Sequence, residues 1–167
     1  MCLVLSFMAR FASSLLDRLI DEQPQSVADA SAAQVSLDQL KDCVARDLEA
    51  LLNARCGMRR DTLQGYQRAS RSILSFGMLD FSSMSLAHTE ERDAICRAIE
   101  EAILTHEPRL RQVQVVLTPD AASNRYTFHI QALLVVNPAR EPVSFNATLQ
   151  PSTQLYSVSK ARSAHFH

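Results

Sequence analysis

Three consecutive segments in the C-terminal half alternate between apolar and polar residues, and this alternation constrains the fold more strongly than any other feature. The segments cover residues 113–117, 126–134 and 143–149. A period of two places every second side chain on one face of a β-strand, so each segment is predicted to be a strand with one buried face. Turn sequences separate the segments, which predicts an antiparallel meander. A shorter last strand is expected over residues 154–158.

The first predicted helix of the folded domain begins at Ser36. Ser36 and Gln39 have the spacing of a capping box, in which each side chain bonds the backbone N–H of the other residue. The helix is expected to end near Arg55, with Gly57 as a left-handed stop residue. Its apolar stripe consists of Leu37, Leu40, Val44, Leu48, Leu51 and Leu52.

A second helix is predicted from its cap residue Thr89 to His106, because Pro108 disfavours helical geometry in the residue before it. Glu100 and Glu101 are expected to form an ordinary solvated face of this helix. Helices that precede strands predict an α+β fold, in which N-terminal helices pack on one face of a C-terminal antiparallel β-meander. The buried stripe is expected to consist of Ile95, Ala98, Ile99, Ala102 and Ile103.

Between these helices, a short helix is predicted over residues 66–74, where four side chains share one face. The apolar loop that follows, residues 75–81, is expected to turn at Gly77. Its two phenylalanines either plug an edge of the core or mark an interface. The four side chains that share a face are those of Tyr66, Ala69, Ile73 and Leu74.

The chain is predicted to have three parts. Residues 1–35 form an apolar segment, amphipathic over 11–20, and a polar linker that starts at residue 21. Residues 36–158 form the folded domain, and residues 159–167 form a frayed polar tail. The apolar segment either docks on another protein or folds back onto its own domain.

The charge balance and the glycine content exclude several classes of protein. The chain has 17 Lys and Arg against 18 Asp and Glu, which gives a formal net charge of −1. This balance argues against nucleic-acid binding and against a polybasic membrane-surface protein. Only 3 glycines are present, which leaves almost no material for a phosphate-binding loop. Dinucleotide-binding and P-loop enzymes are therefore excluded.

The cysteines and histidines do not form a metal-binding pattern. No two cysteines form a C-x-x-C pair, and no histidine follows at the spacing of a zinc ligand. We expect no cofactor, cysteines that stay reduced, and histidines that are exposed or hydrogen-bonded for structural reasons. The residues concerned are Cys2, Cys43, Cys56, Cys96, His88, His106, His129, His165 and His167.

The N-terminus faintly resembles the apolar region of a secretory signal peptide but lacks its other features. Its short apolar run within residues 1–8 has no preceding basic residue and no A-x-A cleavage site. No apolar stretch in the chain approaches the roughly 20 residues of a membrane-spanning helix. We therefore expect a cytoplasmic protein, with translation starting at Met1 or at Met8.

Glu107 is the carboxylate with the most distinctive setting. It lies between the end of a predicted helix and the first predicted strand, next to Pro108 and Arg109. It could clasp the turn locally, contact a partner, or act as a catalytic acid, which in a glycosidase requires a second carboxylate across a cleft. We expect Arg109 to be exposed, so that its removal costs the fold little.

Several sequence blocks occur in an order that resembles a known family. They cover residues 14–19, 46–55, 72–81, 95–103, 107–110 and 141–145. In this order they resemble the TssE family of type VI secretion baseplate subunits, which belongs with a phage baseplate wedge protein in the lysozyme-like tail family. The resemblance extends over about residues 8–158. One departure is Leu79, because the family often has Pro before the Asp of this loop.

The resemblance implies a non-enzymatic, intracellular structural role. It implies a place in the baseplate wedge beside TssF, TssG and TssK, and a link to the first ring of the sheath built from TssB and TssC. Glu107, Pro108 and Arg109 match the family's marked site for wedge contact. We further expect residues 142–158, with Val143 and Phe145, to imitate a sheath subunit by offering an open sheet edge. The alternative, which the family label suggests, is a lysozyme-like peptidoglycan hydrolase.

Overall fold

The computed structural model describes most of the chain as two compact units. The units are Met1–Val44 and Ala45–His167, and their boundary lies inside helix α2, Leu37–Asn53. The described residues are 11–12, 34–58, 60–81, 88–120, 125–136 and 139–161.

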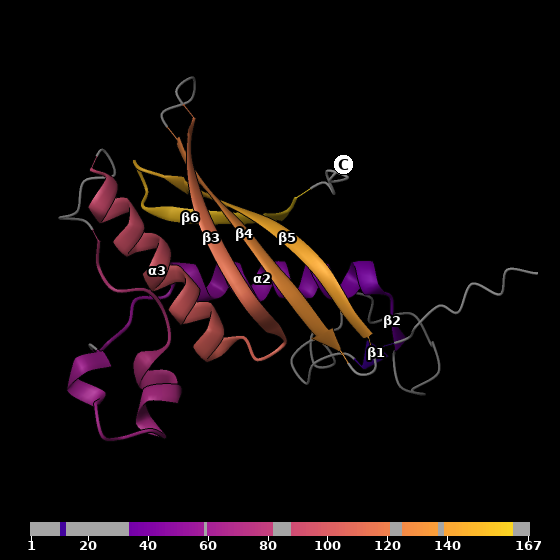
Figure 1. Ribbon diagram of the computed structural model, residues 1–167, viewed down its shortest axis with the longest axis horizontal. Helices are drawn as coiled ribbons and strands as arrows, with labels where there is room; N and C mark the ends of the chain where they lie inside the picture. Colours follow the sequence, from indigo (N-terminus) through magenta and orange to yellow (C-terminus); the bar gives the residue numbers. More distant parts are fainter. Residues whose placement is uncertain are drawn as a thin grey trace, which may run out of the picture. The chain divides into compact units, whose positions relative to one another are not determined.

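The first unit contains a small two-stranded sheet. Strand β1, Phe11–Ala12, pairs antiparallel with β2, Gln34–Val35 (Figure 1). The rest of the predicted amphipathic segment 11–20 lies outside the described residues, as does most of the predicted linker 21–35.

Helix α2 begins as the capping box predicts. The Ser36 N–H donates to Gln39 Oε1 at 2.9 Å, and the Gln39 N–H donates to Ser36 Oγ at 3.2 Å. These two bonds satisfy backbone donors that have no partner within the helix. The helix ends at Asn53, before the predicted end near Arg55, because Arg55 instead forms a parallel bridge with Met78.

The turn at Gly77 is confirmed, and it requires glycine. Gly77 has a φ of +106°, and a Cβ atom built on it would lie 2.6 Å from the carbonyl oxygen of Ala54. The next residue, Met78, donates its N–H to that same oxygen and accepts the N–H of Cys56, each at 2.9 Å. The prediction of a left-handed stop at Gly57 is wrong, because this crossing of two chain segments terminates the helix instead.

The predicted helix over residues 66–74 is wrong. The segment contains short 3₁₀ turns at Ala69–Arg71 and Ile73–Ser75, after an earlier one at Arg60–Leu63. Ser72 separates the later two, since its hydroxyl bonds both the Ala69 carbonyl and the Leu74 N–H. Three of the four side chains of the predicted apolar face are exposed, with 85% of Ile73 accessible.

Helix α3 covers Thr89–His106, close to its predicted extent. Its cap residue is His88, and Thr89 is already helical, with its hydroxyl accepting a bond from Arg92 at 3.1 Å. The predicted buried stripe is confirmed except for Ala98, which is half-buried. Its buried members are Ile95, Ile99, Ala102 and Ile103.

The C-terminal half is a four-stranded antiparallel sheet in the order β3-β4-β5-β6, as the alternation predicts (Figure 1). A bulge interrupts the β3–β4 register between Arg111 and Gln114, where Gln112 has a φ of 52°. The strands are β3 Leu110–Asp120, β4 Arg125–Val136, β5 Ala139–Gln150 and β6 Leu155–Lys160, so β6 extends beyond the predicted 154–158.

The core of the second unit lies between the sheet and the helical segments. Alternate residues of the strands are buried, and so are the apolar stripe of α3 and the C-terminal turns of α2. Two helices followed by an antiparallel sheet confirm the predicted α+β class. The largest fully buried side chains of this unit include Phe128, Phe145, Leu48, Leu52, Met78, Ile99, Ile103, Leu110, Ile130 and Leu134.

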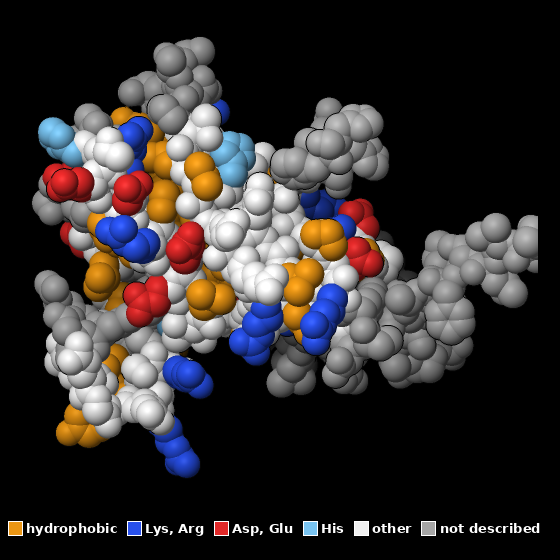
Figure 2. Space-filling view, in the orientation of Figure 1, with side chains coloured by type: hydrophobic (Ala, Val, Ile, Leu, Met, Phe, Trp, Pro, Cys, Tyr) orange, Lys and Arg blue, Asp and Glu red, His pale blue; other side chains and the backbone are white. Residues whose placement is uncertain are grey.

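The surface carries charges of both signs. On the face shown in Figure 2, Lys and Arg side chains lie among acidic and hydrophobic ones, in keeping with the near-zero net charge. Within the described part of the chain, no helix combines the length and the hydropathy needed to cross a bilayer.

Candidate partner-binding site

The turn formed by Glu107, Pro108 and Arg109 connects α3 to β3. Glu107 caps the C-terminus of the helix, and its N–H donates to the Ile103 carbonyl at 2.8 Å. Its own carbonyl accepts the N–H of Leu110 at 3.1 Å. The backbone of the turn is therefore tied to both the helix and the strand.

Side chains hold the same turn through an ion-pair network. Arg109 Nε donates to Glu107 Oε1 at 2.7 Å, and Arg109 Nη2 donates to Glu107 Oε2 at 2.5 Å. The backbone N–H of Arg109 also donates to Glu107 Oε1, at 3.2 Å. Arg109 Nη2 forms a second ion pair with Asp47 of α2. We call these three residues the clasp.

The clasp is largely protected from water. The exposed fractions of the side chains are 7% for Glu107, 23% for Arg109 and 46% for Asp47. The hydrogen bonds that Arg109 donates to Glu107 are the main cause that raises the pKa of Arg109 above its ordinary value, so the guanidinium stays charged. A bidentate pair of this kind fixes both side chains in one geometry.

These positions correct the expectation that Arg109 is an exposed side chain. Pro108 is the exposed residue of the turn, whereas Glu107 is buried and Arg109 is mostly engaged within the chain. The geometry favours the local clasp among the three roles considered for Glu107. It disfavours a catalytic acid, because the carboxylate oxygens already accept three bonds from Arg109. Partner contact through this turn stays a prediction.

The side chains of Val143 and Phe145 lie in the core, contrary to the geometry expected of partner contacts. They are 5% and 1% exposed. Their strand, β5, lies between β4 and β6 and is an interior strand over the region that β6 covers. Direct contact of these two side chains with a partner would require the sheet to open, and their role in binding stays a prediction.

The expected open edge of the sheet is also not found at β6. The outward N–H groups of Tyr156 and Val158 donate to side chains of α2, Asn53 Oδ1 at 2.8 Å and Glu49 Oε2 at 2.7 Å. At the opposite edge, the Val115 N–H donates to Glu100 Oε1 at 2.8 Å. The prediction that Glu100 belongs to an ordinary solvated face is therefore wrong.

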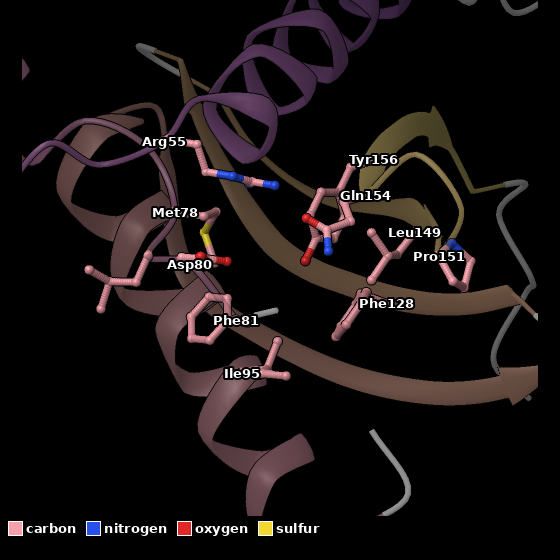
Figure 3. Close-up of a pocket in the computed structure, with 11 residues that line it drawn as sticks. Arg55, Met78, Asp80, Phe81, Ile95, Phe128, Leu149, Pro151, Gln154 and Tyr156 are labelled. Atoms are coloured by element: carbon pink, nitrogen blue, oxygen red, sulfur yellow. The ribbon is translucent and has the colours of Figure 1, made fainter. Parts of the chain in front are cut away.

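The structure also contains a pocket that the sequence did not indicate as a site. Its volume is about 180 Å³. Figure 3 shows Phe81, Ile95 and Phe128 around it, with the Arg55 guanidinium and the Gln154 amide on its polar side. Tyr156 also lines this pocket, and burial raises the pKa of its hydroxyl to about 12. In the sequence, the apolar loop over residues 75–81 is the feature that could have indicated this pocket, since the last residues of the loop line one of its walls.

Of the histidines that the structure describes, His88 is exposed, and His106 and His129 have structural surroundings. His106 Nε2 lies 2.9 Å from the Ser75 carbonyl oxygen and its ring packs edge-on against Phe76. His129 Nδ1 lies 2.8 Å from Asn146 Oδ1. Among the described residues, no group of three or more His, Cys, Asp or Glu side chains could hold a metal ion.

Comparison with known proteins identifies the family. No curated protein matches the chain. Among solved structures, a chain of "The baseplate complex from the type VI secretion system" is similar, with 15% identity and a TM-score of 0.47. That match covers 68% of this chain and 96% of the other. A family model described as "Baseplate wedge protein gp25" matches residues 38–139, which include both long helices and the clasped turn. Because this match covers more than half of the sequence, the chain belongs to the baseplate wedge protein gp25 family.

Proposed function

We propose that this protein is a structural baseplate subunit of a type VI secretion apparatus, and that it joins the wedge complex to the first ring of the sheath. The observation that carries the proposal is membership of the baseplate wedge family over residues 38–139. The ordered sequence blocks that resemble TssE support the type VI assignment. The role requires no catalytic group and no cofactor.

The proposed partners follow from this assignment. On the wedge side they are TssF, TssG and TssK, and on the sheath side they are TssB and TssC. The protein would act in the cytoplasm, in a baseplate assembled at the inner face of the inner membrane. We assign residues 36–160 to the wedge domain, because β6 continues past the predicted boundary at residue 158 and ends at Lys160. Residues 1–35 are assigned to the N-terminal apolar segment with its linker, and the remainder of the predicted tail 159–167 to a tail.

The clasped turn is the proposed wedge contact. Its backbone is fixed at both ends and its side chains are fixed by the ion pairs, so little conformational entropy would be lost on binding. The clasp contains two carboxylates and one guanidinium, which leaves it with a net negative charge. Asp47 is its most exposed member. We therefore propose that the wedge presents a basic group to Asp47.

Asp47→Asn tests this contact with little effect on the fold, because the bidentate Glu107–Arg109 pair remains. Co-purification with TssF, TssG and TssK should show weaker binding of the variant and a reduced dependence on salt. Asp93→Asn is the matched control, since it removes the same charge at an exposed position of α3. Equal binding of wild type, D47N and D93N across salt concentrations would reject the electrostatic contact. Failure of the wild type to recover any wedge protein would reject the proposed function itself.

A further inference from the structure

The hydrogen-bond alternation of the sheet shows which groups of β6 point away from β5. In an antiparallel pair, alternate residues bond to the neighbouring strand and the remaining residues point outward. The Ala161 N–H donates to the Ser144 carbonyl at 2.9 Å, which places the odd-numbered residues of β6 on the β5 side. Tyr156 and Val158 therefore direct their backbone groups to the outer edge.

Two side chains of α2 occupy this outer edge as a neighbouring strand would. Asn53 donates to the Tyr156 carbonyl at 2.9 Å and accepts the Tyr156 N–H at 2.8 Å, so a single amide forms both bonds of a strand residue. Glu49 Oε2 accepts the Val158 N–H at 2.7 Å. Four helical residues rise about 6 Å, and two strand residues extend about 6.8 Å. The spacing of Glu49 and Asn53 therefore matches two outward positions of β6.

The opposite edge of the sheet is closed in a similar way. Glu100 of α3 accepts the Val115 N–H, and the sulfur of Cys96, one turn earlier, accepts the Leu117 N–H. The next outward position of β3 is Pro119, which has no N–H to offer. Closure at both edges by side chains from different helices indicates that blocking strand addition is a built feature of the fold.

We propose that the outer edge of β6 is a latent pairing edge, and that Glu49 and Asn53 form a latch that prevents it from pairing with β6 of a second copy. An edge strand pairs readily with its own copy because a two-fold axis makes the surface self-complementary. When Tyr156 is placed opposite Val158 of the second copy, Lys160 falls opposite Gln154. No like charges meet in that register, so charge alone would not prevent pairing.

The double variant Glu49→Ala/Asn53→Ala opens the latch. We expect the folded variant to form a dimer as its concentration rises, in sedimentation equilibrium, under conditions in which the wild type does not change. At low concentration, the amides of Tyr156 and Val158 should exchange with deuterium at least about tenfold faster than in wild type, because they lose their acceptors. At high concentration, the same amides should regain protection.

Two further variants separate the latch from general destabilisation. Glu49→Gln keeps a side-chain oxygen that can accept the Val158 N–H, so it should behave as wild type. Adding Val158→Pro to the double variant removes an outward donor, so the dimer should be lost. If the double variant does not fold, Asn53→Ala alone provides the test, with a smaller concentration dependence expected. A folded latch variant that stays monomeric at all concentrations, or a dimer that survives Val158→Pro, would overturn the proposal.

Discussion

Replacement of Arg109 by alanine should destabilise the protein, because Glu107 would remain buried as an unpaired carboxylate. Removing one partner of a fully buried ion pair costs about 3–5 kcal/mol. Arg109 is 23% exposed, so water can reach part of the site, and we expect a loss of about 2–4 kcal/mol. For a chain of this size, that loss lowers the midpoint of thermal unfolding by about 6–12 °C.

The measurement is urea or thermal unfolding of the wild type, Arg109→Ala and Arg111→Ala. Arg111 is an exposed arginine of β3, two residues after Arg109, so its removal should change the free energy of unfolding by less than about 0.5 kcal/mol. In the double variant Glu107→Ala/Arg109→Ala, the total loss should be smaller than the sum of the single losses, by about 1–3 kcal/mol. An Arg109→Ala variant as stable as Arg111→Ala would show that the clasp does not stabilise the fold.

Two further predictions concern Gly77 and Tyr156. Gly77→Ala should lower the free energy of unfolding in urea by about 2–4 kcal/mol, because residue 77 has a left-handed backbone conformation and the new Cβ would meet the Ala54 carbonyl. Gly57→Ala is the control, since a Cβ at residue 57 has open space and should change the stability little. Burial of Tyr156 raises the pKa of its hydroxyl from 10 to about 12, so between these pH values the unfolded state ionises more readily than the folded state. The contribution of the neutral hydroxyl to the free energy of unfolding is therefore complete below pH 10 and is lost as the pH rises to about 12. Tyr156→Phe should therefore reduce the loss of stability over that interval, and an unchanged alkaline profile would contradict the assignment.

Local sequence patterns determined the secondary structure where the signal lay within a few residues. The capping box of Ser36 and Gln39 set the start of α2, because both hydrogen bonds close over three residues. The alternation of the C-terminal half set the strands and their order, since each strand buries one face and short connections favour antiparallel neighbours. The failure over residues 66–74 is also local in origin, because the Ser72 hydroxyl competes for the backbone groups of the helix.

The positions of the polar side chains depended on the tertiary structure. Asp47 and Arg109 meet across 62 residues of sequence, and Asn53 reaches Tyr156 across 103. No periodicity distinguishes Glu100, which closes a sheet edge, from Glu101, which is exposed on the same helix. Periodicity reports which face of an element is buried, because burial follows the repeat of the backbone. The partner of a polar side chain is instead set by how the elements pack, which only the folded chain decides.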